Sequence, residues 1–135
     1  MIYKHKVNYY ETDRMGITHH SNYIRWMEEA RVFYLAEVGW DYDRLEELGV
    51  VSPVLSVSAQ YIKTTTFPDD ITIDVEVEEF KGVKLKMKYT MTNEAGEVVC
   101  RATSEHCFLD SAGVPVRMKK QYPEFYGILS EAAGK

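Results

Sequence analysis

The spacing of apolar side chains after residue 22 predicts one long helix. Apolar residues recur at the 3.6-residue helical period, at Tyr23, Trp26, Met27, Ala30, Tyr34 and Val38. Ser21 or Asn22 can cap the start of this helix, and Gly39 suits its C-terminal cap. The stripe is widened by further apolar residues, which are Ile24, Val32, Phe33 and Leu35. We therefore expect the helix to be covered on most of its sides.

A shorter helix is predicted between Asp41 and Leu48. Asp41 is a favoured N-cap residue, and Gly49 is suited to end the helix. Leu45 and Leu48 are three positions apart, so we expect both to face inward.

Further along the chain the apolar period changes to two, which predicts strands. Apolar residues alternate with polar ones over residues 71–78 and again over residues 84–91. A three-residue loop, Phe80–Gly82, would join the two runs as an antiparallel hairpin.

That loop sets a register for the predicted hairpin. Glu76 faces Lys86 on the solvated side, and Val75 faces Met87 on the apolar side. The acidic and basic runs are thus interpreted as a solvated ladder of ion pairs, each of little energetic weight, and not as two binding patches.

Two similar turns divide the rest of the chain. Asn93–Gly96 and Asp110–Gly113 both begin with Asn or Asp and end with glycine. Glu97–Leu109 between them reads as a long strand, and a first strand fits Tyr3–Tyr9. The predicted fold class is α+β, with one antiparallel sheet wrapped around one helix and residues 1–135 forming a single domain.

Composition narrows the functional classes. The 135-residue chain is 45% hydrophobic and 27% charged, as in a globular protein. Its net charge of −5 and its lack of a basic block argue against nucleic-acid binding. No run reaches the roughly 18 apolar residues of a membrane helix. Cys100 and Cys107 lie about 23 Å apart in one predicted strand, too far for a disulfide, so we expect a cytoplasmic protein with free thiols.

Polar and titratable residues are concentrated in residues 9–23, directly before the long helix. A helix N-terminus offers N–H groups and partial positive charge that can stabilise an oxyanion. Asp13 could act as a nucleophile or as a general base toward water, and His20 could orient a substrate or that carboxylate. Gly16 would let a ligand approach the backbone closely. Each residue also has a structural alternative: a turn or cap for Asp13, a local hydrogen bond for His20 and a turn for Gly16.

Two segments carry a resemblance to a known family. Residues 9–23 read Tyr-x-Glu-Thr-Asp-x-x-Gly-x-x-x-His-x-x-Tyr, and residues 108–118 read Phe-Leu-Asp-Ser-Ala-Gly-Val-Pro-Val-Arg-Met. Together they resemble the hotdog-fold acyl-CoA thioesterases of the 4-hydroxybenzoyl-CoA thioesterase and YbgC-like group. The resemblance extends from Tyr9 to about Pro123.

This resemblance implies a hotdog fold and the hydrolysis of an acyl-CoA thioester to a free acid and coenzyme A. Coenzyme A is then part of the substrate, and no separate cofactor is expected. Asp13 matches the catalytic carboxylate of these enzymes, and Tyr9 and His20 match residues that line the same site. The resemblance also implies active sites between subunits, so we expect a homodimer or a homotetramer.

Further residues are candidates for substrate binding. Backbone N–H groups near Ser21, Asn22 and Tyr23, or around Gly16, could stabilise the oxyanion. Tyr23 and Tyr61 could line the acyl site with their rings, which suit an aromatic or an aliphatic acyl group.

After Tyr61 the chain departs from the enzymes that it resembles. Where they often carry a Pro-Ala-Arg-like stretch, this sequence reads Thr-Thr-Thr-Phe-Pro-Asp over residues 64–69. The candidates for the cation that meets the phosphates of coenzyme A are Lys63, Arg117, Lys119 and Lys120. A plain solvated surface is the alternative for these basic residues.

Other chemistries have weaker support. His19 and His20 are adjacent but lack any metal-ligand spacing, so no metal site is expected. The Gly-x-Ser-x-Gly pattern of a serine nucleophile is missing from the sequence. The alternatives to a thioesterase are a non-catalytic protein that binds an acyl group or thioester in the same groove, and a hydratase on the same fold. Should Asp13 not be catalytic, Glu11 is the next carboxylate to consider.

Overall fold

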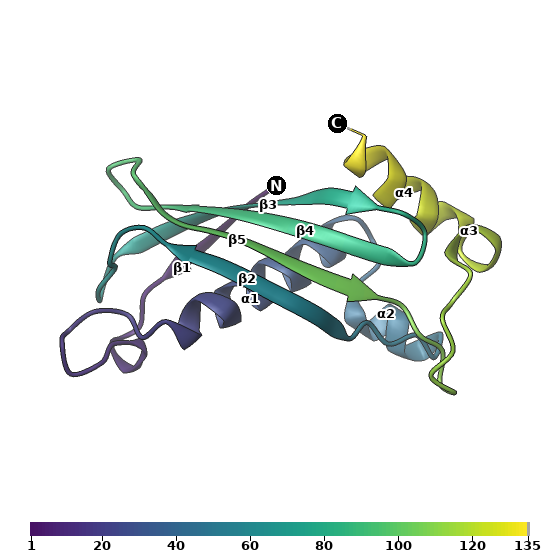
Figure 1. Ribbon diagram of the computed structural model, residues 1–135, viewed down its shortest axis with the longest axis horizontal. Helices are drawn as coiled ribbons and strands as arrows, with labels where there is room; N and C mark the ends of the chain where they lie inside the picture. Colours follow the sequence, from purple (N-terminus) through teal and green to yellow (C-terminus); the bar gives the residue numbers. More distant parts are fainter. Residues whose placement is uncertain (135) are drawn as a thin grey trace.

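The computed structural model describes residues 1–134. Within them, a five-stranded antiparallel sheet in the order β1-β3-β4-β5-β2 lies along helix α1 (Figure 1). The strands are β1 (Ile2–Lys6), β2 (Val54–Tyr61), β3 (Asp70–Phe80), β4 (Lys84–Thr92) and β5 (Val98–Cys107). The helices are α1 (Ser21–Glu37), α2 (Tyr42–Glu47), α3 (Met118–Gln121) and α4 (Pro123–Ala133), with a 3-10 turn η1 (Tyr9–Glu11) before α1. The predicted α+β class and the long helix are confirmed.

The hydrophobic core lies between α1 and the inner face of the sheet. Trp26 and Ala30 of α1 are fully buried, as is Val75 of β3. The other side of the helix is open in the single chain, where Ile24 is 44% and Val32 is 42% exposed. The prediction that the helix is covered on most sides is therefore wrong for one chain, because its sheet reaches only one side of α1.

The β3–β4 hairpin has the predicted faces but a different register. Val75 and the residues that alternate with it face the core, as predicted. However, Val75 pairs with Tyr89 and Glu76 pairs with Lys88, two positions beyond the predicted partners. A bulge next to Glu78 adds a residue to β3 near the loop.

The packing of α4 accounts for this shift. Phe80 pairs with Leu85 and its ring contacts Tyr126 of α4, with 5.6 Å between the ring centroids. The loop therefore consists of residues 81–83 and does not include Phe80. A shift of two residues preserves the alternation, so the exposed ladder of ion pairs persists with different partners.

Helices α3 and α4 were not predicted from the sequence. Phe125 and Leu129, four positions apart, are fully buried, and Phe125 stacks on Trp40 with 4.8 Å between ring centroids. Pro123 stands at the first helical position, where its missing N–H costs nothing. The segment around Pro115 forms an isolated bridge to Leu109 in place of a regular strand.

The shorter elements agree in part with the predictions. Strand β1 ends at Lys6, and not at Tyr9, because the chain turns into η1. Asp41 caps α2 as predicted, since its Oδ1 accepts a hydrogen bond of 2.9 Å from the Arg44 N–H. Leu48 lies beyond the end of α2 and is 44% exposed, so the prediction that it faces inward is wrong.

The predicted turns and the free thiols are confirmed. Gly96 and Gly113 both have a φ of +79°, which glycine adopts without strain. Cys100 and Cys107 both lie in β5 and are free. Among residues 1–134, the helices are too short or too polar to cross a membrane.

Candidate active site

A tight loop of residues 12–18, the Asp13 loop, connects η1 to the segment before α1. Thr12 bridges Thr18 at its neck, and the Asp13 N–H donates to the Ile17 carbonyl at 2.8 Å. Gly16 has a φ of +79° and a Cβ there would meet open space, so the turn itself accounts for glycine at this position. A close approach of ligand to Gly16 stays a prediction.

Asp13 belongs to the linings of two cavities. Its Oδ1 accepts a hydrogen bond of 2.8 Å from the Met15 N–H, which fixes the side chain within the loop. The small cavity, about 250 Å³, is lined by Asp13, Ile17, Thr18, His20, Tyr23, Tyr61, Ile62, Lys63 and Thr64. The large cavity, about 690 Å³, is lined by Tyr9, Tyr10, Thr12, Asp13, Arg14, His19, Ser21, Asn22 and Arg25. Asp13 thus faces both cavities.

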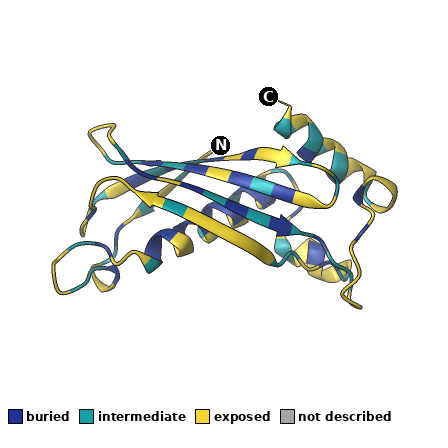
Figure 2. Ribbon diagram, viewed as in Figure 1, coloured by how far each residue is buried: buried dark blue, intermediate teal, exposed yellow. Residues whose placement is uncertain are grey.

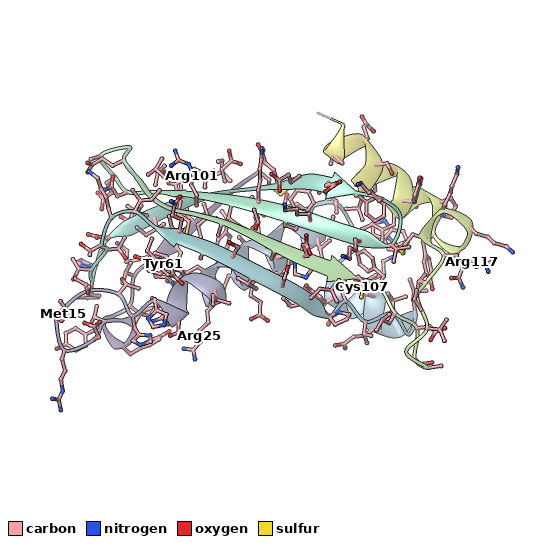
Figure 3. The ribbon with its side chains drawn as sticks, viewed as in Figure 1. Met15, Arg25, Tyr61, Arg101, Cys107 and Arg117 are labelled. Atoms are coloured by element: carbon pink, nitrogen blue, oxygen red, sulfur yellow. The ribbon has the colours of Figure 1, made fainter. Side chains whose placement is uncertain are left out.

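These cavities bring together nearly all of the predicted site residues. His20, Tyr23, Tyr61 and Lys63 line the small cavity, and Tyr9, Ser21 and Asn22 line the large one. Gly16 lies in the Asp13 loop but is part of neither lining. Figure 3 shows Met15, Tyr61 and Arg25 at the same end of the molecule, although Tyr61 comes from β2.

Aromatic rings form one wall of the small cavity. The ring of Tyr61 lies 5.1 Å from that of Tyr23 and 6.1 Å from that of His20 between centroids. Tyr23 is buried, and its hydroxyl lies 2.9 Å from Thr65 Oγ1, which in turn donates to Thr18 Oγ1. Burial raises the pKa of Tyr23, so its phenol is neutral at ordinary pH. Tyr23 therefore presents a neutral aromatic ring to the small cavity.

The N–H groups at the start of α1 differ in their availability. Those of Ser21, Asn22 and Tyr23 donate locally, to His19 Nδ1, the His19 carbonyl and the His20 carbonyl. Within residues 1–134 the N–H of His20 has no such partner, and it lies at the positive end of the helix. Among the residues described, the unpaired N–H group at this end of α1 thus belongs to His20, one residue before the predicted set of Ser21, Asn22 and Tyr23.

The predicted phosphate-binding cations are not all near the site. Lys63 pairs with Glu97. Arg117, which begins the basic segment at α3, lies at the opposite end of the molecule from Tyr61 (Figure 3). Sequence reasoning missed Arg14 and Arg25, which line the large cavity, although Arg14 directly follows Asp13.

The other carboxylate of the motif, Glu11, faces away from both cavities and is buried. Its carboxylate accepts hydrogen bonds from His5, Asn8 and Trp26, so it is bound within the protein and does not replace Asp13. In the described part of the chain, no group of three or more His, Cys, Asp and Glu residues is arranged to hold a metal ion.

Comparison with known proteins shows the family of this chain. The thioesterase-like superfamily matches residues 7–126. The chain belongs to this family. It is 33% identical over 128 residues to a Bacillus subtilis protein with the provisional name acyl-CoA thioesterase YneP, covering 94% of this chain and 93% of the relative. It is 25% identical over 119 residues to the 4-hydroxybenzoyl-CoA thioesterase of Pseudomonas sp., covering 83% of this chain and 84% of that enzyme.

A solved structure extends the likeness to the fold. The DHNA-CoA thioesterase from Staphylococcus aureus matches with a TM-score of 0.93 and 28% identity, covering 98% of this chain and 90% of that one. The hotdog fold and the family resemblance in residues 9–23 and 108–118 are thereby confirmed.

Proposed function

We propose that this protein hydrolyses an acyl-CoA thioester to a free acid and coenzyme A, with Asp13 as the catalytic carboxylate. Hydrolysis of a thioester follows from membership of the family and from the names of its relatives. The observation that carries the role of Asp13 is its place in the linings of both cavities at the N-terminal end of α1. A thioester that lies across both cavities presents its carbonyl carbon to this carboxylate.

Asp13 can serve by either of two routes. As a general base it takes a proton from water, whose oxygen attacks the carbonyl carbon; the C–S bond then breaks and the thiolate takes up a proton. As a nucleophile it forms a mixed anhydride while the thiolate leaves, and water then cleaves the anhydride. In both routes the N–H of His20 and the positive end of α1 would stabilise the oxyanion, an effect of about 3 kcal/mol.

The two cavities suit different parts of such a substrate. The small cavity has an aromatic and aliphatic lining, with Tyr23 and Tyr61 as its walls, which favours the acyl group. The large cavity carries Arg14 and Arg25 near its surface, which favours the anionic coenzyme A portion. His20, on the wall of the small cavity, would then lie next to the thioester carbonyl.

The proposed assembly is a homodimer, or a pair of such dimers, built on the edge strand β2. Figure 2 colours almost all of β2 as exposed, and Val54 and Val57 on its inner face are 50% and 38% exposed. The other edge strand, β1, presents Lys4 and Lys6, which discourage pairing at that edge. A second copy at β2 would cover the open side of α1 and bring its own residues to the small cavity, which Tyr61 borders.

Release of free thiol from a panel of acyl-CoA substrates tests the proposed activity. The panel contains short, long and aromatic acyl groups, and kcat/KM is compared across it. Saturable release well above the uncatalysed rate is expected for at least one member. Binding of these substrates with no thiol release would contradict hydrolysis and support a protein that only holds the acyl group.

A further inference from the structure

Glu11 is a buried carboxylate that the proposed chemistry does not use. It lies two residues before Asp13 and is 4% exposed. Its Oε1 accepts from the Asn8 N–H at 2.7 Å and lies 2.8 Å from His5 Nε2, and its Oε2 accepts from Trp26 Nε1 at 2.6 Å. Burial raises the pKa of Glu11, but these hydrogen bonds outweigh burial and hold the pKa below its ordinary value. Glu11 is therefore ionised in the folded protein.

The backbone of Glu11 closes the neck of the Asp13 loop. Its carbonyl accepts from the His19 N–H at 2.8 Å and from the Asn22 side-chain amide at 2.9 Å. The neck joins the chain just before Asp13 to the chain just before His20. The backbone of Glu11 thus ties the neck of the Asp13 loop to Asn22 in the first turn of α1.

His5 on β1 is held between two carboxylates. Its Nε2 lies 2.8 Å from Glu11 and its Nδ1 lies 3.2 Å from Glu29 of α1, which also accepts from the hydroxyl of Tyr3 at 2.8 Å. Both ring nitrogens of His5 therefore have a carboxylate oxygen within hydrogen-bonding distance. The ring of His5 also packs on that of Trp26, with 4.7 Å between centroids, and its pairing partner on β3 is Ile71.

We propose that Glu11 and His5 are positioning residues, which use a hydrogen-bonded clamp braced by Glu29 to hold the Asp13 loop against the first turn of α1. The inference rests on the proposed function, since it concerns the carboxylate that performs the chemistry. Loss of a purely structural contact lowers stability. Loss of a positioning contact lowers kcat and leaves substrate affinity in place, because a misplacement of about 1 Å can cost about 100-fold in rate.

The variant Glu11→Gln tests the clamp with little change in shape. Glutamine has an NH₂ group in place of one carboxylate oxygen, and this group cannot accept the hydrogen bonds that the oxygen accepted. We therefore expect the loop to shift. We expect kcat to fall about 10- to 100-fold while KM stays within about threefold of the wild-type value. The matched control is Glu37→Gln, the same change on an exposed position of α1, which should leave kcat unchanged.

A double variant separates positioning from independent catalysis. Because Glu11 acts through Asp13, Glu11→Gln combined with Asp13→Asn should be no slower than Asp13→Asn alone. Wild-type kcat in folded Glu11→Gln, or losses that multiply in the double variant, would overturn the inference. Near-normal turnover in Asp13→Asn would instead overturn the proposed function, so the two failures are distinguishable.

If Glu11→Gln does not fold, His5→Gln provides the test. It removes the imidazole ring and leaves the bonds of Glu11 to Asn8 and Trp26 in place. A lower kcat at unchanged KM supports the clamp, and a wild-type kcat overturns it.

Discussion

Tyr23 illustrates how burial decides the part a side chain plays at this site. The sequence placed it among the substrate-binding residues, and the structure seals its hydroxyl against Thr65, 2.9 Å away. We predict that Tyr23→Phe lowers the free energy of unfolding by about 1 to 2 kcal/mol, because Thr65 loses a buried partner. Since the ring persists, kcat should stay within about threefold of wild type. Denaturant unfolding and thiol release measure the two quantities, and a loss of kcat beyond about 100-fold would give the hydroxyl a chemical role.

His106 is a second residue whose state the sequence does not reveal. It lies on the inner face of β5, almost fully buried, with Nε2 2.7 Å from Ser104 Oγ. Burial, followed by the nearby charge of Arg31, lowers the pKa of His106 to about 4. The strand alternation alone predicts that this position faces inward, but the nearby charge comes from Arg31 on α1, which the alternation does not predict.

The shifted pKa of His106 makes stability depend on pH. Below pH about 6.5 the unfolded chain takes up a proton at this histidine, whereas the folded protein does not until about pH 4. The unfolded state binds more protons in this window, so stability is full above about pH 6.5 and falls as pH drops toward 4, by at most roughly 1.4 kcal/mol per unit. Guanidinium unfolding at several pH values should show a shallower dependence in His106→Gln. Equal slopes in both proteins would contradict a neutral buried His106.

The sequence predicted which candidate residues lie close together better than it predicted what contacts them. Asp13, His20 and Tyr9 lie in one contiguous motif, and the structure places them around the same two cavities. Tyr61 arrives from β2, so its approach depends on sheet order, which local patterns do not encode. For the same reason the pairing of Lys63 with a residue near β5 was not predictable.

At the scale of elements, periodicity predicted which side chains face the core but not where strands pair. The alternation in β3 and β4 gave the correct faces, since a shift of two residues preserves them. The register itself depends on Phe80, which packs against Tyr126 of α4. Helix α4 was not predicted, so the information needed to place the loop was absent.

Two variants of the β3–β4 hairpin test which face is buried and how little the exposed ion pairs contribute to stability. Exchange of charges in Glu76→Lys with Lys88→Glu should change stability by no more than about 0.5 kcal/mol, because this cross-strand pair is exposed. Val75→Asp should cost at least roughly 3 kcal/mol, since it buries a charge at a fully enclosed position. Chemical unfolding of both variants checks the assignment. A mild effect of Val75→Asp would mean that the faces are inverted.

At the scale of the whole molecule, the exposed side of α1 and the unpaired edge of β2 are the surfaces on which we expect a second copy of the chain to bind. We predict that the wild type shows two or four times the 15.6 kDa chain mass in light scattering, and that Val57→Lys shifts it to the monomer. The reason is that Val57 lies on the apolar inner face, opposite Ser104. Ser58→Lys, on the outer face of the same strand, is the matched control and should keep the assembly. An unchanged mass for Val57→Lys would exclude this edge as the interface.

The role of Asp13 as the catalytic carboxylate is the central claim, and the turnover of Asp13→Asn measures it most directly. Asparagine preserves the size of the side chain and can still accept from the Met15 N–H, but it has no negative charge with which to attack a carbonyl or take a proton from water. With the best acyl-CoA of the panel, kcat should fall by at least about 100-fold, while the variant stays folded and binds coenzyme A like the wild type. Near-normal thiol release from folded Asp13→Asn would contradict the account.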